Sequence, residues 1–338
     1  MLFCLVRLLT DNLFTFNSKN IMNKDIIYFW KSVLIFVCLL TIVDVTIGIA
    51  TDRIMPKMPN YSGQMAKDNF RLHKLDTEVV IIGSSRGSHH YVTKQLSDSL
   101  DAFYNHHLTI YNAAIDGKFA NSNCCAAEVI IARYSPKLVI FDLSENQLRG
   151  DNVSDIEFSA PFYWNDSIVH RYLNNISLKE RILMKSSLYR YNGKLFRIAY
   201  SFLWPLAEDD GYLPLYGTAI DTTKINKSNR NQPSSIELNS YKKENFENVL
   251  KKYANSDVQL VVVCSPRFRP NDDNQQLYQM CKEYGIPFID LYDIPFFNSH
   301  PELFKDAGHL NDEGAHLFTA LLFEKLKPNL ENIVLNHM

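Results

Sequence analysis

The sequence predicts an α/β protein in which helices cover both faces of a parallel sheet, behind one membrane-spanning helix. Three observations predict this class. A run of β-branched residues ends in a Gly-Ser-Ser turn at 83–85, strand-like and helix-like segments alternate after it, and a long apolar segment precedes both. Alternation at this spacing favours parallel strands, because each crossover helix returns the chain to the same end of the sheet. At 338 residues the chain is long enough for one such domain with insertions.

Composition excludes some classes of function. The net charge is −2 with the signs interspersed, so no basic stripe marks the chain as a nucleic-acid-binding protein. The cysteines lack CxxC or Cys/His metal spacing, and several lie inside apolar runs. We expect them to fill the core, with one disulfide still possible if the domain faces an oxidising compartment. They are Cys4, Cys38, Cys124, Cys125, Cys264 and Cys281.

Residues 26–50 predict the membrane-spanning helix. Their only charges are Lys31 and Asp44, and the stretch Ser32–Ala50 is long enough to cross a hydrocarbon core. A cleavable signal peptide fits less well, because the apolar region is too long and no small-residue cleavage site follows it. Asp44 is costly in lipid, and we expect it to snorkel to the interface or to pair with a partner helix.

The flanks of this helix set its expected orientation and start. Basic residues before and after it are nearly balanced, and we expect a cytoplasmic N-terminus with the domain outside. Residues 1–25 form an extension in which Met22 would be a more ordinary start. Residues 51–76 contain Pro56, Pro59 and Gly63 and are expected to form a tether. The α/β domain then covers residues 77–330.

The α/β rhythm can be followed through the domain. Strands are expected at 79–82, 108–117 and 137–147, and helices between them at 86–100 and 121–133. The rhythm stops at an insertion, about 148–240, that is helical around 178–203 and turn-rich at 208–235 with a charged run at 224–230. We expect this insertion to lie over the cleft and to shape the substrate site. After the insertion, helices are expected at 236–253, 274–284 and 312–327, and strands at 258–266 and 287–291.

Ser85 is the first candidate functional residue. It follows the first strand, and in open α/β sheets the C-terminal ends of the strands face the ligand crevice. The next helix begins there and offers free N–H groups to an anion. The alternative is that Ser84 or Ser85 only caps this helix.

The second candidate is Asp306-Ala-Gly-His309, just before the last helix. A carboxylate three residues from an imidazole can fix the tautomer that leaves the other ring nitrogen free as a base. A serine, a histidine and an orienting aspartate are the minimal set for acyl transfer. The alternative is a surface histidine satisfied by its neighbour.

These motifs together resemble the SGNH (GDSL-like) hydrolase family over residues 78–147 and 258–327. Gly83-Ser84-Ser85 takes the place of Gly-Asp-Ser, and the glycine of the second block matches Gly117 in NAAIDG. The third block, Gly-x-Asn-Asp, matches Ser144 to Gln147 and puts its asparagine at Asn146; the fourth, Asp-x-x-His, matches Asp306 and His309. Ser84, Ser144 and Gln147 depart from the family pattern, so the third block is the least conforming one.

The resemblance implies a three-layer, flavodoxin-like sheet and a serine-dependent acyl enzyme that needs no cofactor or metal. Ser85 would be the nucleophile, His309 the base and Asp306 its orienting partner. The N–H groups of Ser85 and Gly117 and the amide of Asn146 would bind the oxyanion. The acceptor site decides between an esterase and an O-acyltransferase.

The apolar anchor extends the resemblance to membrane-held proteins that acylate cell-surface polysaccharides or teichoic acids, often beside a multispan acyl-exporting protein. The expected partners are therefore the membrane, an acyl donor and a cell-surface polysaccharide. Two other classes stay open. One is a tethered glycan-binding module that lost the chemistry, which the altered third block favours. The other is a structural subunit of a membrane complex, with Asp44 as its contact.

Three arginines are candidate substrate-binding residues. Arg86 would bind a carboxylate or phosphate, or form a salt bridge at the helix surface. Arg267 and Arg269 follow the strand at 258–266 and would meet an anionic acceptor, or carry only solvated charge. The pairs His89-His90 and His106-His107 are expected at the surface, because adjacent histidines point in different directions and lack carboxylate spacing. GSSRGS lacks the lysine of a phosphate loop.

Overall fold

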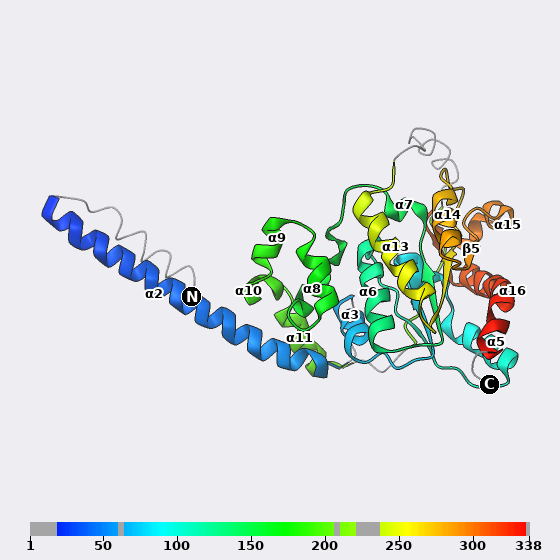
Figure 1. Ribbon diagram of the computed structural model, residues 1–338, viewed down its shortest axis with the longest axis horizontal. Helices are drawn as coiled ribbons and strands as arrows, with labels where there is room; N and C mark the ends of the chain where they lie inside the picture. The colour runs from blue at the N-terminus through cyan, green and yellow to red at the C-terminus, as the bar shows by residue number, and fades with distance from the viewer. Residues whose placement is uncertain (1–18, 60–63, 206–209, 221–236, 336–338) are drawn as a thin grey trace.

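The computed structural model describes residues 19–59, 64–205, 210–220 and 237–335, and a five-stranded parallel sheet lies at its centre (Figure 1). The strands are β1 (Val79–Ile82), β2 (Ile110–Asn112), β3 (Leu138–Asp142), β4 (Gln259–Cys264) and β5 (Phe288–Asp290). Their order is β2-β1-β3-β4-β5, and every neighbouring pair is parallel. This is the flavodoxin-like doubly wound order, so the predicted fold class is confirmed.

Alternate residues of the strands enter two separate apolar cores. Val80 and Phe141 belong to the first core, whereas Ile81 and Ile140 belong to the second. The first face is covered by α6 (Ala120–Arg133), α13 (Ser240–Ala254) and α14 (Gln275–Glu283), and the second by α5 (Thr93–Tyr104) and α16 (Asp312–Leu335). Because both faces are buried, β1 and the first four residues of β3 form continuous apolar runs instead of alternating, and the polar residue Asp142 comes only at the end of β3.

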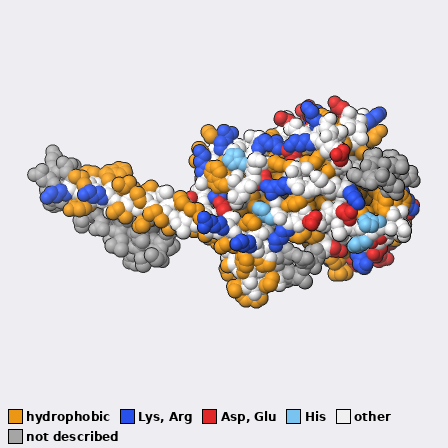
Figure 2. Space-filling model, turned by 60° about the horizontal axis from the view of Figure 1, so that its bottom comes forward, with side chains coloured by type: hydrophobic (Ala, Val, Ile, Leu, Met, Phe, Trp, Pro, Cys, Tyr) orange, Lys and Arg blue, Asp and Glu red, His pale blue; other side chains and the backbone are white. Residues whose placement is uncertain are grey.

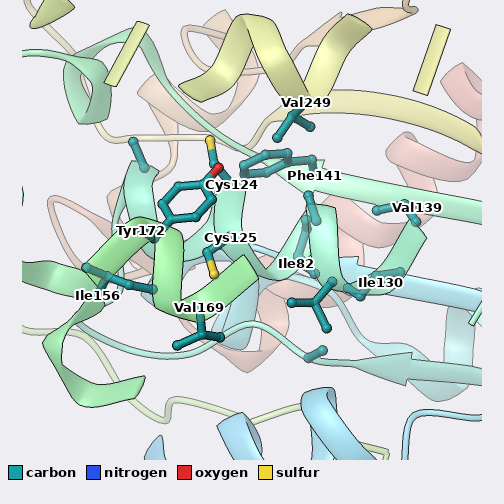
Figure 3. Close-up of a cluster of buried hydrophobic side chains, with 14 of the residues drawn as sticks. Ile82, Cys124, Cys125, Ile130, Val139, Phe141, Ile156, Val169, Tyr172 and Val249 are labelled. Carbon is teal, nitrogen blue, oxygen red and sulfur yellow. The ribbon is translucent and has the colours of Figure 1, made fainter. Parts of the chain in front are cut away.

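Three of the cysteines, Cys124, Cys125 and Cys281, belong to the first core. Cys124 and Cys125 lie among the side chains between α6, β3 and α8 (Figure 3). Cys264 and Cys281 are also buried, and all five cysteines in the described part of the chain are free thiols. The prediction of core filling is confirmed for these four and wrong for Cys38, which is exposed on the apolar helix near the N-terminus, while Cys4 lies outside the described residues.

The N-terminal part contains more helix than expected. α2 (Lys19–Ile54) is continuous, and it is long and apolar enough to cross a membrane. After η1 (Met55–Lys57), α3 (Gln64–His73) packs on the domain instead of forming a free tether. Arg71 of α3 is buried and donates to the carbonyl of Ala113 at 2.6 Å. The sequence pattern missed this helix because its docked face is polar.

The helical part of the insertion lies beside α6 and α2 (Figure 1). It consists of η2 (Ser154–Phe162), α8 (Ser167–Asn174), α9 (Leu178–Leu183), α10 (Ser187–Arg190) and α11 (Leu195–Leu203). Buried Glu128 of α6 accepts from Arg171 at 2.5 Å and Tyr172 at 2.7 Å, which fixes α8. Residues 210–220, named the strap below, return to the end of the sheet, where the amide of Asn112 on β2 donates to Asp210 O at 2.8 Å. The charged run 224–230 lies outside the described residues.

Candidate active site

Ser85 is the first residue of α4 (Ser85–His90), directly after the turn that ends β1. The turn requires Gly83, because a Cβ there would lie 2.9 Å from the Cβ of Asp142 on β3. Ser84 occupies the N-cap position but makes no capping bond, and its hydroxyl accepts from the amide of Gln147 at 3.2 Å. The cap alternative therefore does not account for either serine.

Asp306 and His309 face each other across a two-stranded antiparallel pair. β6 (Phe304–Asp306) and β7 (His309–Leu310) form it, where a loop was expected. The amide of Gly308 in the turn donates to Asp306 Oδ1 at 2.8 Å. The register of this pair, with Asp306 opposite His309, sets the carboxylate against the imidazole.

The three side chains form one continuous hydrogen-bonded array. His309 Nδ1 donates to Asp306 at 2.8 Å from Oδ1, and His309 Nε2 lies 2.7 Å from Ser85 Oγ. The bond from His309 lowers the pKa of Asp306, against burial that raises it, so the carboxylate is charged near neutral pH. With its Nδ1 proton held by Asp306, the imidazole presents the Nε2 lone pair to the Ser85 hydroxyl. Such an array can remove a proton from the serine.

His90 holds the strand that carries His309. Its Nε2 accepts from the amide of Leu310 at 2.9 Å, and its Nδ1 donates to Ser265 Oγ at 3.0 Å. Burial and the nearby charges of Arg86 and His309 hold the pKa of His90 well below its ordinary value, so the ring is neutral. The expectation that this histidine lies at the surface was wrong, because its side chain is fully buried.

His89 was also expected at the surface and is buried. Its Nδ1–H donates to the carbonyl of Leu213 at 2.6 Å and its Nε2–H donates to Asp116 Oδ2 at 3.1 Å. Burial lowers the pKa of His89, but Asp116 and the Leu213 carbonyl outweigh it, and the net pKa is raised. In the described residues no group of three or more His, Cys, Asp and Glu side chains is arranged to hold a metal ion.

The strap joins α4 to the Asp306–His309 strand pair. The amide of Leu213 donates to Ser88 O at 3.0 Å, and Leu215 O accepts from Asp312 N at 2.7 Å. Further along, Tyr216 O accepts from Lys305 Nζ at 2.9 Å, one residue before Asp306. The insertion thus meets the Ser85 helix and the strand pair through the strap, and it meets Gly117 through η2 at the pocket described below.

Arg86 lies inside the domain, neither at the helix surface nor open to a ligand. Its guanidinium donates to Ser265 O at 3.2 Å and lies 3.8 Å from buried Asp142. Burial disfavours the charged form, but Asp142 more than compensates and raises the pKa of Arg86. Asp142 also accepts from Tyr91 at 2.7 Å. Arg86 is therefore part of the support beneath the Ser85 helix.

Arg267 and Arg269 lie at the edge of the site, on the loop after β4. The amide of the intervening Phe268 donates to Ala307 O at 3.1 Å, which places the loop against the turn between Asp306 and His309. Arg267 donates to the hydroxyl of Tyr292 at 3.2 Å, whereas Arg269 is exposed. Arg269 is the better placed of the two to meet an anionic substrate.

The predicted oxyanion residues Gly117 and Asn146 lie on two segments that contact the serine turn through neighbouring residues: Ile115 N donates to Gly83 O at 3.1 Å, and Gln147 donates to Ser84. Gly117 has φ +72, a backbone conformation that favours glycine, and follows Asp116, which binds His89. Asn146 is exposed on α7 (Glu145–Leu148), directly before Gln147, whose amide binds Ser84. Gln147 is a contact of the serine turn that the sequence did not single out, since it replaces an aspartate of the family pattern.

A pocket of about 360 Å³ opens from Gly117 into the insertion. Exposed rings of Phe119 and Phe158 line it, together with Glu157, Tyr189 and Lys194. Burial lowers the pKa of Lys194 to about 8, and the charge of Lys118 adds to this. Aromatic faces combined with a few polar groups are the usual lining of a small-molecule site. The insertion builds this wall from η2, from Tyr189 of α10, and from Met184 and Lys194 in the adjoining turns.

No family model matches the chain, and no curated protein matches it by sequence. Among solved structures it is similar to a two-domain esterase active on acetylated mannans, with 13% identity, a TM-score of 0.40 and coverage of 74% of this chain and 48% of that one. A gut microbial diltiazem-metabolizing enzyme has 12% identity and a TM-score of 0.36, with 74% and 46% covered.

A third similar structure is an α/β hydrolase from the metagenome of Lake Arreo, Spain, with 10% identity, a TM-score of 0.36 and coverage of 73% of this chain and 93% of that one. The chain therefore spans about half the length of the first two structures.

Proposed function

We propose that the protein is a membrane-anchored, serine-dependent enzyme that cleaves or transfers acyl esters through an acyl-enzyme on Ser85. The observation that carries this proposal is the array in which His309 Nε2 lies 2.7 Å from Ser85 Oγ while Asp306 accepts from His309 Nδ1. A nucleophile, a base and a group that orients the base are the parts that acyl transfer needs.

The chemistry follows from these positions. Ser85 Oγ attacks the ester carbonyl while His309 Nε2 takes its proton, and the charge that develops on the carbonyl oxygen is bound by the N–H groups of Ser85 and Gly117 with the amide of Asn146. The intermediate collapses, the C–O bond to the leaving alcohol breaks, and His309 returns the proton to that alcohol. A second hydroxyl then attacks the acyl-Ser85 ester and restores the serine.

The acceptor of the acyl group distinguishes an esterase from an O-acyltransferase. The pocket that opens from Gly117 has exposed phenylalanine rings and polar groups, which suit a sugar better than a long alkyl chain. The apolar length of α2 would hold this pocket at a membrane. We therefore propose a cell-surface glycan as the acceptor, outside the membrane, with the acyl group delivered by a multispan membrane protein.

A fluorophosphonate probe tests the acyl-enzyme. The full-length protein in detergent should be labelled, and Ser85→Ala and His309→Ala should not be, whereas Ser84→Ala should retain labelling. Release of acetate from an acetyl ester, measured with and without a glycan oligosaccharide, then separates hydrolysis from transfer: acyl transfer predicts acetylated oligosaccharide as the product. Labelling of Ser85→Ala at the rate of the unaltered protein would refute the assignment.

The second candidate is a membrane-tethered glycan-binding module without activity. It is favoured by the third block, where Ser144 and Gln147 replace the family residues and Asn146 is exposed. This candidate predicts no labelling by the fluorophosphonate, but binding of the oligosaccharide that is lost in Phe158→Ala. Calorimetric titration of the full-length protein in detergent measures that binding.

A further inference from the structure

The surface of α11 is unusual for a helix in contact with water. Only a narrow stripe, Ile198 and Ser201, is buried. On the rest of the helix and directly after it, Phe196 is 77% exposed, Leu203 68% and Trp204 56%. Large apolar side chains that gather in this way usually mark a protein or membrane contact.

The neighbouring helices have the same character and carry positive charge. On α9, Leu178 is 67% exposed and Ile182 58%. Between residues 178 and 204 the basic residues outnumber the acidic ones, and the single acid, Glu180, accepts from Tyr189 at 2.7 Å. The exposed basic side chains are Lys179, Arg181, Lys185 and Arg197. Apolar faces rich in Leu, Phe and Trp beside Lys and Arg are typical of helices that lie in a membrane interface.

These helices are fixed beside the apolar helix α2. Asp44 accepts from Ser186 Oγ at 2.6 Å and from the amide of Leu188 at 2.7 Å. One turn further, Gly48 allows close contact, since a Cβ there would lie 2.3 Å from Ser187 Oγ. Figure 1 shows α10 beside α2, α11 near its C-terminal end and α9 beyond α10, and in Figure 2 apolar and basic side chains gather where α2 meets the domain.

We propose that α9, α10 and α11 form a second membrane contact that lies in the interface of the bilayer that α2 crosses. This inference rests on the proposed membrane anchoring. The apolar side chains of α9 and α11 enter the acyl region, and the exposed Lys and Arg residues meet anionic headgroups. Asp44, satisfied by α10, then lies at the edge of the hydrocarbon instead of within it.

The position of Asp44 also shifts the expected span toward the N-terminus. At 1.5 Å per residue, the apolar stretch Ile26–Val43 is roughly 27 Å long, close to the thickness of a hydrocarbon core. Lys31 within it can snorkel toward the interface. The part of α2 after Asp44 is then a stalk packed on the domain and not part of the span.

A bilayer fits this surface better than a second copy of the chain. In an isologous dimer the same basic side chains would face each other, and like charges across an interface are unfavourable. An anionic lipid surface neutralises them without any specific register.

Fluorophores at defined positions test the proposal in the full-length protein. In a background with Cys4→Ser and Cys38→Ser, an environment-sensitive dye is attached to Phe196→Cys or Leu203→Cys. Ile42→Cys, in α2, is the control for the span. Phe296→Cys is the matched control, because Phe296 is 47% exposed on α15 (Pro295–Ser299) at the opposite end of the domain. The protein is reconstituted in phosphatidylcholine–phosphatidylglycerol vesicles with brominated acyl chains.

Dyes at residues 196 and 203 should be quenched at least about half as strongly as the dye at residue 42, as expected for side chains 5–10 Å into the interface. The dye at residue 296 should show less than about a tenth of the quenching at residue 42. If the dye at residue 42 is quenched while the dyes at 196 and 203 are quenched as little as the one at 296, the interfacial contact is refuted, but the membrane-spanning role of α2 is supported. A blue-shifted but unquenched dye at 196 would mean a protein contact and would also refute it. An unquenched residue 42 would refute the anchor and this inference together, and would leave the test of Ser85 labelling unaffected.

Discussion

The ring of His90 accepts a hydrogen bond from the amide of Leu310 at 2.9 Å and thereby ties the helix that starts with Ser85 to the strand that carries His309. The other ring nitrogen donates to Ser265 at the end of β4. One neutral, buried imidazole therefore sets the spacing between the serine and the histidine of the site. Neither bond involves a reacting atom, so His90 is a positioning residue.

His90→Phe should lower kcat for a small acetyl ester about 10²-fold, because a displacement of about 1 Å in a reacting group costs that much. KM should change little, since the substrate does not contact His90. Burst titration with the fluorophosphonate gives the concentration of active sites to which kcat is referred. His106→Phe, on an exposed loop, is the control and should behave as the unaltered protein. An unchanged kcat per active site in folded His90→Phe would assign His90 a purely structural role.

Local sequence chemistry made Ser85, Asp306 and His309 candidates, and the family resemblance joined them into one array. Ser85 follows an uninterrupted apolar strand, and the strand ends of a parallel sheet meet at one edge, so its place was fixed by fold class. Asp306 and His309 are three residues apart and needed only a turn to meet. The parallel arrangement of the strands follows from their alternation with helices, whereas the flavodoxin-like order was implied by the family resemblance.

What the sequence did not predict depends on contacts between distant segments. His90 meets Leu310 across 220 residues, and nothing near His90 indicates that its ring is buried. Arg71 and Asp68 made α3 look like a polar tether, because their partners Ala113 and Lys118 lie on another loop. Long-range polar contacts of this kind leave no periodic pattern in the chain.

Arg86→Ala should destabilise the protein strongly. It would leave the carboxylate of Asp142 buried without its cation, and removing one partner of a buried pair costs about 3–5 kcal/mol. Thermal unfolding in detergent measures the loss, with Lys94→Ala as the control. Lys94 pairs with Asp98 at 3.1 Å but both are exposed, so its removal should cost no more than about 1 kcal/mol. Equal losses for the two variants would contradict the structural role of Arg86.

The strap should be held more firmly at low pH. The folded-state pKa of His89 is raised above the ordinary value of 6.5 by Asp116 and the Leu213 carbonyl, which outweigh its burial. Its contribution to stability is therefore full below about pH 6.5 and is lost as the pH rises through the raised pKa. Hydrogen exchange at Leu213, relative to Leu250, should accelerate above that pH beyond the intrinsic change. Asp116→Asn should remove this extra dependence, and its persistence there would exclude His89 as the cause.

Phe119 tests the pocket as the acceptor site. Its ring is 43% exposed in the pocket wall two residues after Gly117, so Phe119→Ala removes a stacking surface without opening the core. We expect KM for the glycan oligosaccharide to rise about 10-fold, as one stacking contact is worth roughly 0.5–1.5 kcal/mol. Hydrolysis of a small acetyl ester without glycan should be unchanged. A rise in KM for the small ester as well would place Phe119 at the acyl side instead.

Asn146 and Gln147 are adjacent amides, and kinetics can decide which one serves the oxyanion. If Asn146 donates to it, Asn146→Ala should lower kcat about 10²- to 10³-fold, or roughly 3–4 kcal/mol, with KM nearly unchanged. Asn146→Asp should be at least as damaging, because it places a negative charge where one develops. If Asn146 only stabilises its own turn, both variants should lose melting temperature and keep kcat per titrated active site.

Gln147→Ala is the matched comparison. Its amide already binds Ser84 Oγ at 3.2 Å, so a supporting role predicts a loss that Ser84→Ala reproduces, because both variants break the same bond. A role in the oxyanion hole predicts instead that Gln147→Ala is impaired while Ser84→Ala is not. Unchanged kcat in Asn146→Ala together with that second result would move the oxyanion amide from Asn146 to Gln147. It would also explain how the site keeps its donors although the third block departs from the family pattern.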